Sequence, residues 1–95
     1  MAAYLLANVE ITDPVAFEDY RKRVPATMAA YGGRYLVRGG ATEVLEGDGV
    51  PSRVVLIEFP DMARLKAWYR SPEYQLLLAL RMKSARSSAT AIEGV

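Results

Sequence analysis

The 95-residue sequence contains neither cysteine nor histidine. Without cysteine, the chain has no disulfide, no thiolate nucleophile and no ligand for soft metals. Without histidine, it lacks the usual general base near neutral pH and the commonest ligand of transition metals. We therefore expect neither metal nor cofactor. Any chemistry must use carboxylates, tyrosines, arginines, lysines, hydroxyls and backbone donors.

An excess of charge of one sign is also lacking. Twelve basic and eleven acidic residues give a net charge of +1, which predicts no strong attraction to nucleic acid or to an anionic membrane. No segment approaches the roughly 20 apolar residues that span a bilayer, and the first residues do not resemble a targeting signal. We expect a cytoplasmic protein with no membrane partner. With 52% apolar residues, the chain is long enough for one domain, residues 1–95.

The first half of the chain indicates a strand, a helix and a second strand. Residues 4–11 read as a strand, and Asp13 followed by Pro14 is a typical helix start. Apolar and aromatic residues then recur at steps of three and four through Tyr31, and Gly32 suits a left-handed helix cap. Pro25 is predicted to bend or break this helix. The second strand covers residues 34–38.

The second half repeats the pattern. Residues 41–46 could extend the second strand, with a bulge or a bend expected at Gly39 and Gly40. Residues 53–59 form the strongest predicted strand, helices begin after Asp61 and Ser71, and a last strand is expected at 89–95. The order β-α-β-β-α-β predicts an α+β, ferredoxin-like fold, with helices on one face of a four-stranded antiparallel sheet. Because both faces of the strands carry apolar residues, we expect a homodimer to cover the other face.

Two arginines and a glutamate form the sharpest candidate site. Strict alternation along the second strand places Arg34 and Arg38 on one face, where Glu58 of the next strand could reach a guanidinium. One reading is an ion pair that fixes the strand register or the dimer seam. The other is a clamp for an anion or a carboxylate, with Glu58 and Arg38 as catalytic candidates.

Further polar and aromatic residues are candidates for a substrate pocket together with Arg34. Asn8 either satisfies nearby backbone or donates to a substrate. The aromatic rings on the two helices expected after Asp61 and Ser71 either fill the core or line a pocket. Arg81 reaches either solvent or a buried acceptor. These helical candidates are Trp68, Tyr69, Tyr74 and Arg81.

The order and spacing of several short motifs resemble the domain-of-unknown-function family 1330 over nearly the whole chain. The motifs are Tyr4 with Asn8-Val9, Thr12-Asp13-Pro14 ahead of Phe17 and Tyr20, the segment 32–40, Leu45-Glu46-Gly47, Glu58-Phe59-Pro60, and Trp68-Tyr69 with Ser71-Pro72-Glu73-Tyr74 and Arg81. The resemblance implies the dimeric α/β-barrel superfamily, in which two ferredoxin-like subunits join their sheets and each can hold a pocket between sheet and helices.

That superfamily includes cofactor-independent monooxygenases, muconolactone isomerases and haem-dependent enzymes. The haem branch usually needs an axial histidine, which this chain lacks. If the protein is an enzyme, the resemblance implies monooxygenase-like or isomerase-like chemistry without a cofactor. We expect a protein that binds or transforms a small organic molecule, such as an aromatic compound or a carboxylate. The alternatives are a non-catalytic ligand-binding or regulatory protein and a purely structural homodimer.

Overall fold

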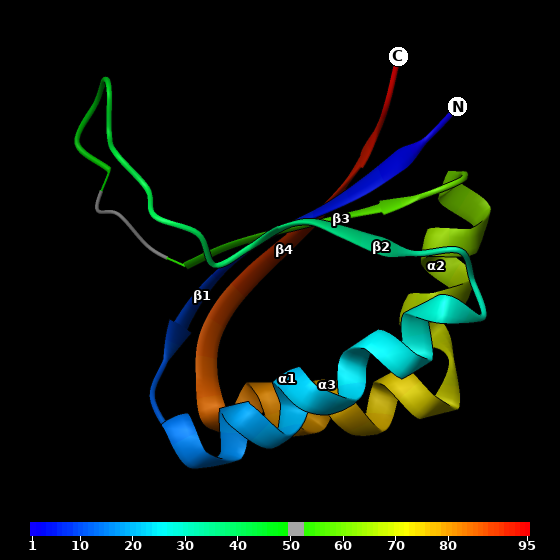
Figure 1. The fold of residues 1–95 in the computed structure, drawn as a ribbon, viewed down its shortest axis with the longest axis horizontal. Coiled ribbons are helices and arrows are strands. Elements are labelled where there is room, and N and C mark those ends of the chain that lie inside the picture. Colours follow the sequence, from blue (N-terminus) through cyan, green and yellow to red (C-terminus); the bar gives the residue numbers. More distant parts are fainter. Residues whose placement is uncertain (50–52) are drawn as a thin grey trace.

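The computed structural model describes residues 1–49 and 53–95, and it has the predicted ferredoxin-like architecture (Figure 1). The elements in chain order are β1 (Ala3–Ile11), α1 (Pro14–Ala29), β2 (Arg34–Arg38), β3 (Arg53–Phe59), α2 (Met62–Arg70), α3 (Pro72–Ser84) and β4 (Ala85–Glu93). The strands form one antiparallel sheet in the order β2-β3-β1-β4. All three helices lie on one face of this sheet, and none covers the other face (Figure 1).

The helices begin where the capping residues predict. The Asp13 carboxylate accepts a hydrogen bond from the Ala16 amide at 3.2 Å. Asp61 starts α2 in the same way, with a distance of 2.8 Å to the Arg64 amide. Each bond satisfies one of the amides that the first turn of a helix leaves without a partner. At the end of α1, Gly32 has the expected left-handed conformation, with a φ of +74°.

Pro25 does not break α1, so of the two expected effects, a bend or a break, the break does not occur. The helix runs without interruption to Ala29. Burial of one face holds it in place, because Val24 and Met28 on either side of the proline are 1% and 2% exposed. A proline still removes one helical hydrogen bond, and the carbonyl it leaves free has another donor, described below.

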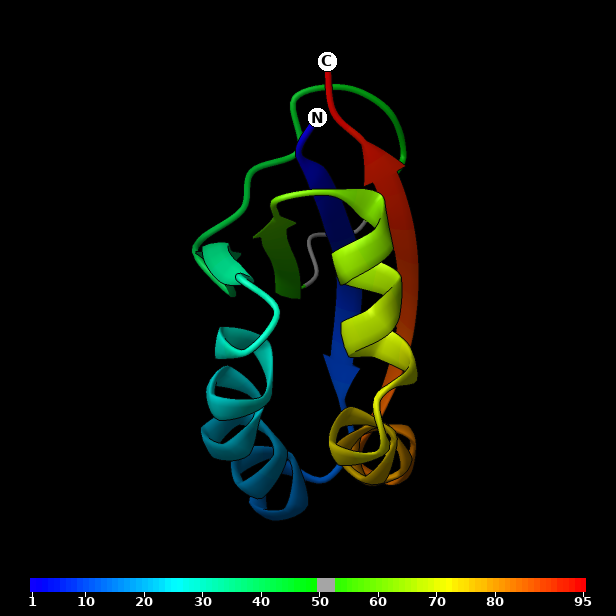
Figure 2. The same ribbon diagram turned by 90° about the vertical axis from the view of Figure 1, so that its right-hand side faces the viewer.

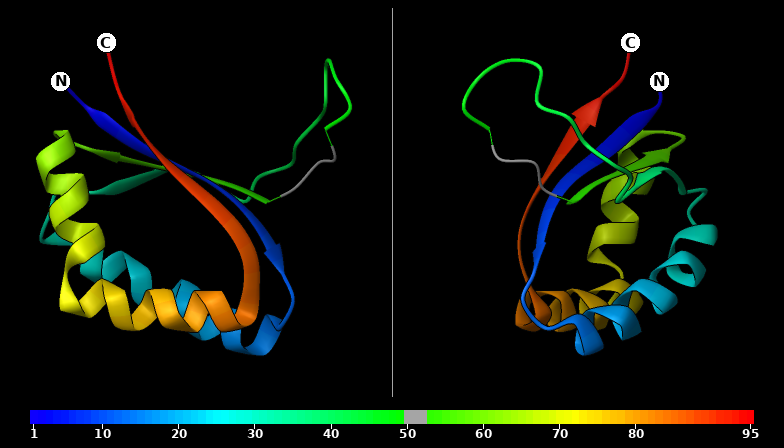
Figure 3. Two further views of the ribbon diagram at one scale, coloured as in Figure 1. Left: turned by 180° about the vertical axis from the view of Figure 1, so that it is seen from behind. Right: turned by 60° about the vertical axis from the view of Figure 1, so that its left-hand side comes forward.

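The last strand and the segment after β2 also differ from expectation. β4 begins directly after α3 at Ala85, four residues before the predicted start, and ends at Glu93. Residues 41–46 form no strand; from β2 they lead away from the sheet and the helices (Figures 1 and 3). The two chain ends lie close together, where the Gly94 amide donates to the Ala2 carbonyl at 2.8 Å.

The core lies between the sheet and the helices, where α1 and α3 pack against each other (Figure 2). Alternate residues of β1 are buried against the helices, and the largest fully buried side chains are Trp68, Tyr74 and Phe59. Among the described residues, no helix is both long enough and apolar enough to cross a membrane.

Candidate functional site

A β-bulge in β2 separates the two arginines that strict alternation had placed together. Arg34 pairs with Glu58, but Arg38 pairs with Val55, because the register shifts at Leu36. Since Val55 and Glu58 are three residues apart on β3, they face opposite sides of the sheet. Arg34 therefore lies on the uncovered face and Arg38 faces the helices. The predicted shared face was wrong. The bulge lies at Leu36, whereas the glycine pair carries a bend at Gly39.

Arg34 and Glu58 form an ion pair on the uncovered face. The Nε and Nη2 atoms of Arg34 lie 2.8 and 2.7 Å from one Glu58 carboxylate oxygen. The hydrogen bond from Arg34 lowers the pKa of Glu58, and a hydrogen bond from Tyr4 acts in the same direction. Donating that bond raises the pKa of the Tyr4 hydroxyl. This contact matches the ion-pair reading, and it places Glu58 on the face opposite Arg38.

A cavity opens on the other side of the sheet, between β1, β2, β3 and the helices. Its volume is about 30 Å³, enough for one or two water molecules. Its lining combines apolar strand residues, four aromatic rings and four arginines. The rings belong to Phe17, Tyr20, Tyr35 and Trp68, and the arginines are Arg21, Arg38, Arg53 and Arg81. None of the described residues that line it carries a carboxylate.

Arg81 is the most deeply buried of these arginines. It lies on α3 one turn after Leu78 and two after Tyr74, on the face turned to the core, and is only 6% exposed. Its Nη1 donates to the Tyr74 hydroxyl at 3.2 Å, whereas its Nε is buried without a hydrogen-bond partner. The described part of the chain places no carboxylate within 4 Å of it. An arginine so buried normally has an anionic partner.

A chain of hydroxyl groups continues from Arg81 to α1. The Tyr74 and Tyr20 hydroxyls lie 2.9 Å apart, within hydrogen-bond distance. Burial is the main reason why the pKa of Tyr74 lies far above its ordinary value, and the nearby Tyr20 raises that pKa further. The Tyr74 phenol is therefore neutral near pH 7 and able to donate. Beside them, Trp68 packs on Tyr74 with ring centroids 4.0 Å apart and donates its Nε1 to the Thr27 hydroxyl at 3.0 Å.

Arg38 and Arg53 face the same cavity from β2 and β3. The Arg38 guanidinium lies 4.5 Å from the centre of the Tyr35 ring, and that of Arg53 lies 5.8 Å from the centre of Phe17. Such contacts stabilise a cation without neutralising it. The Nε atoms of both arginines are buried without a partner. Gly39 leaves room for Arg53, because a Cβ atom there would overlap the guanidinium.

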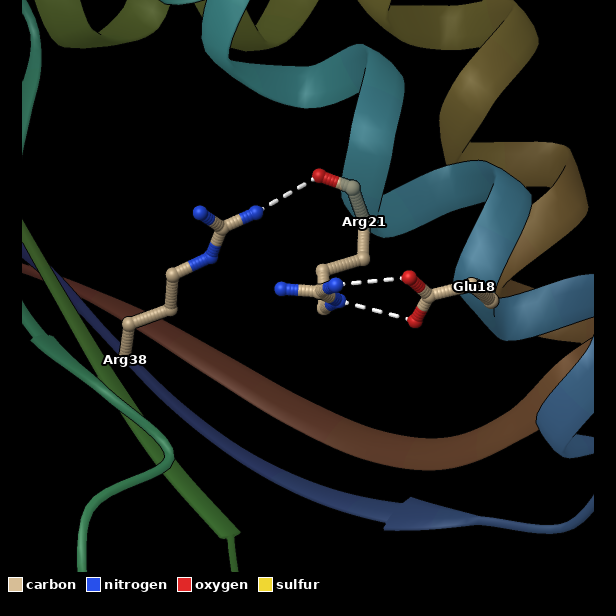
Figure 4. A network of polar contacts seen from close by, with 3 residues as sticks. All are labelled: Glu18, Arg21 and Arg38. Atoms are coloured by element: carbon tan, nitrogen blue, oxygen red, sulfur yellow. Dashed lines mark hydrogen bonds and ion pairs between the residues drawn. The ribbon is translucent and has the colours of Figure 1, made fainter.

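Arg21 differs from the other three because a carboxylate neutralises it. Its Nε and Nη2 donate to the two oxygens of Glu18 at 2.9 and 2.6 Å (Figure 4). This hydrogen bond is the largest cause of the lowered pKa of Glu18. In the described residues, Arg38, Arg53 and Arg81 have no such ion pair. The cavity therefore carries uncompensated positive charge.

The structure brings together only some of the predicted site residues. Arg38, Trp68 and Arg81 line the cavity, and Tyr74 lies directly behind it. Asn8 is exposed on the uncovered face, opposite Val54, so it does not share a pocket with Trp68 as expected. Tyr69 is partly buried and contacts the rings of Trp68 and Tyr74.

Sequence reasoning missed Arg53 and the aromatic residues of the first helix and second strand. Arg53 carried a usable signal, because it shares a strand face with Val55 and Ile57 by simple alternation. A charge on an otherwise apolar face indicates a buried or cavity-lining group. The described residues contain no group of three or more acidic side chains that could hold a metal ion.

Comparison with known proteins identifies the family. A family model described as Domain of unknown function (DUF1330) matches residues 2–95. The chain belongs to this family. The resemblance inferred from its motifs is thus confirmed. A search of curated proteins finds no match for this DUF1330 member.

Solved structures with the same fold share less than a fifth of their residues with this DUF1330 chain. RPA0582 from Rhodopseudomonas palustris, a protein of unknown function, has a TM-score of 0.79 and 18% identity, covering 99% of this chain and 82% of its own. SnoaB, a cofactor-independent oxygenase from Streptomyces nogalater, has a TM-score of 0.70 and 16% identity, with coverages of 99% and 93%. A dimeric ferredoxin-like protein of unknown function from Jannaschia sp. CCS1 has a TM-score of 0.66 and 17% identity, with coverages of 99% and 100%. At these identities the likeness shows the fold alone.

Proposed function

We propose that this protein binds a small organic anion, with a carboxylate head and an apolar or aromatic body, in the cavity between its sheet and helices. The observation that supports this most is the convergence of three arginines on one cavity. Each has a buried Nε atom without a hydrogen-bond partner, and none has an ion pair among the described residues.

The charge of the cavity arginines favours an anionic ligand. Burying a cation without an anionic partner costs several kcal/mol. A planar carboxylate accepts two hydrogen bonds from one guanidinium and so supplies both the charge and the acceptors. A neutral ligand of the same shape supplies neither. We therefore expect the cavity to select anions over neutral analogues.

The shape and lining of the cavity constrain the rest of the ligand. Rings and aliphatic side chains make up the surface around the arginines, which favours an apolar body stacked against Trp68 or Phe17. A benzoate-sized ligand exceeds the present volume of about 30 Å³. Its entry requires the cavity to widen, which movement of the partly exposed Arg53 would allow, whereas Arg81 lies deeper.

The test compares benzoate with benzamide, its neutral analogue, by isothermal titration calorimetry. We expect benzoate to bind and benzamide to bind at least about tenfold more weakly, since one charge-assisted pair contributes about 1.5–3 kcal/mol. Arg81→Met should weaken benzoate binding by a similar factor. Arg23→Met serves as the matched control, because Arg23 lies on the exposed surface of α1 beside Asp19.

Two results would contradict the proposal. One is equal affinity for benzoate and benzamide, and the other is unchanged benzoate affinity in a folded Arg81→Met variant. Circular dichroism and thermal unfolding of each variant separate lost binding from lost folding.

Catalysis at the same cavity is the second candidate function. The chain of hydrogen bonds from Arg81 through Tyr74 to Tyr20 favours it, because a cation and hydroxyl donors can stabilise negative charge that develops on a bound substrate. Glu58 takes no part in this version, because it lies on the other face. Turnover of a ligand by the wild type, lost in Tyr20→Phe with binding retained, would distinguish an enzyme from a binding protein.

The uncovered sheet face supports a homodimer as part of the proposal. Its apolar side chains are partly or well exposed in the single chain; they are Tyr4, Leu6, Val37, Val54, Leu56 and Ile92. A patch of this kind on a soluble domain usually marks an interface. The similar structures from Jannaschia and Thermobifida fusca are described as dimeric.

A further inference from the structure

The proline inside α1 creates a hydrogen-bond acceptor at the edge of the cavity. In an α-helix, the amide of residue 25 would donate to the carbonyl of residue 21. Pro25 has no amide hydrogen, so the Arg21 carbonyl has no such helical donor. The carbonyl is instead bound from outside the helix, because Nη2 of Arg38 on β2 donates to it at 2.7 Å (Figure 4).

This bond fixes one corner of the Arg38 guanidinium and leaves the neighbouring corner unused. Nε and Nη2 form the edge by which an arginine binds both oxygens of a carboxylate, as Arg21 does with Glu18. In Arg38, Nη2 is bound to the carbonyl while Nε is buried without a partner. The ring of Tyr35 supports the guanidinium at 4.5 Å.

Glu18, a carboxylate whose pKa Arg38 helps to lower, is already occupied and competes little for Arg38. Glu18 accepts two hydrogen bonds from the Arg21 side chain. The backbone carbonyl of Arg21 carries no full charge, so it orients Arg38 without neutralising it. The guanidinium is thus held in place with its charge still available.

We propose that Pro25 is a positioning residue of the anion site: the carbonyl that it frees on Arg21 holds Arg38 at the cavity, with Nε directed to a ligand carboxylate. This inference rests on the proposed function. It assigns to the proline a role in ligand binding that acts only through Arg38. A guanidinium fixed in advance loses less conformational entropy on binding than a free one.

Pro25→Ala tests the inference, with Pro14→Ala as the matched control. Alanine at position 25 restores an amide that takes the Arg21 carbonyl back into the helix. Pro14 is the first residue of α1, where a missing amide leaves no helical carbonyl without a donor. We expect Pro25→Ala to weaken benzoate binding about threefold to tenfold, the cost of ordering one free arginine. Pro14→Ala should bind as the wild type does.

A second measurement reports on Arg38 without any ligand. In nitrogen-15 NMR spectra of the unliganded protein, a hydrogen-bonded Arg38 Nη group should give resolved signals, because the bond slows rotation about Cζ–Nη. We expect these signals in the wild type and in Pro14→Ala and expect them to be lost in Pro25→Ala. Arg38→Ala identifies the signals.

The outcomes separate this inference from the proposed function. Weaker benzoate binding in Pro25→Ala, together with the lost Arg38 signals, supports both. Benzoate binding that is equal or tighter in Pro25→Ala overturns the positioning role and leaves the anion site intact. If the wild type does not bind benzoate, the anion site fails and the positioning role fails with it. A thermal unfolding temperature of Pro25→Ala at or above that of the wild type shows that the fold is retained.

Discussion

At the scale of single residues, the arginines differ in what compensates their charge. Arg34 and Arg21 each have a carboxylate partner. Arg81 has a phenol and Arg38 has a backbone carbonyl, while Arg53 faces an aromatic ring. Neither a neutral acceptor nor a ring neutralises a guanidinium. Of the four arginines that line the cavity, the three without an ion pair among the described residues are also the three with buried, unpaired Nε atoms, and this coincidence is the basis of the proposed site.

Replacing Glu58 tests whether its ion pair with Arg34 stabilises the fold. Arg34 lowers the pKa of Glu58 below its ordinary value of 4.5. A carboxylate whose pKa is lower in the folded state stabilises the fold at pH values above its pKa in the unfolded state. That stabilisation is lost as the pH falls through the pKa of the folded state. We expect Glu58→Gln to lower the thermal unfolding temperature at pH 6 and 7, with a difference from the wild type that shrinks toward about pH 3.

Differential scanning calorimetry from pH 3 to 7 measures this effect, with Glu46→Gln as the control. Glu46 lies in the exposed segment after β2 and has no ion pair within the described residues. A Glu58→Gln variant whose difference from the wild type is constant over this range would contradict the ion-pair account. Benzoate affinity should not change, because Glu58 lies on the other face of the sheet.

At the scale of elements, the sequence predicted what is local and missed what depends on pairing. The helix starts at Asp13 and Asp61 follow from capping chemistry, which needs only neighbouring residues. The bulge at Leu36 has no local signature, since no glycine or proline marks it. It arises where β2 meets β3, and a shift of one residue reverses the face of every later side chain. Arg38 was therefore assigned to the wrong face.

The candidate site shows the same division. Helical spacing predicts that Tyr74, Leu78 and Arg81 share one face of α3. All three are buried in the structure. Helical spacing does not predict the hydroxyl groups that continue from Arg81, because Tyr74 contacts Tyr20, which lies 54 residues earlier in the chain. The bond from Arg38 to the Arg21 carbonyl joins β2 to α1. Pro25 indicated that a carbonyl would be free, but only the fold shows which side chain binds it.

At the scale of the whole molecule, one sheet face is covered by helices and the other is open (Figures 1 and 2). A sheet with apolar residues on both faces is stable in water only when both are covered. The proposed homodimer covers the open face. In this dimer the ion pair of Arg34 and Glu58 lies near the interface. The arginine cavity of each chain stays away from the interface, between its sheet and its helices.

Light scattering after size-exclusion chromatography tests this arrangement at micromolar concentration. We expect a mass of twice the 10.5 kDa of one chain. Leu56→Glu, in the middle of the open face, should shift the protein toward the monomer, because a buried unpaired carboxylate is unfavourable. Val15→Glu is the control, since Val15 is 84% exposed on α1. A stable monomer in the wild type would contradict the dimer.

The most direct test of the anion site is a crystal structure grown with 4-bromobenzoate, using the anomalous signal of bromine to locate the ligand. We expect bromine density inside the cavity between the sheet and the helices, with the carboxylate within hydrogen-bond distance of Arg81 or Arg38 and the ring against the aromatic lining. Density only on the open sheet face or the outer surface, or an empty cavity at saturating ligand, would contradict it.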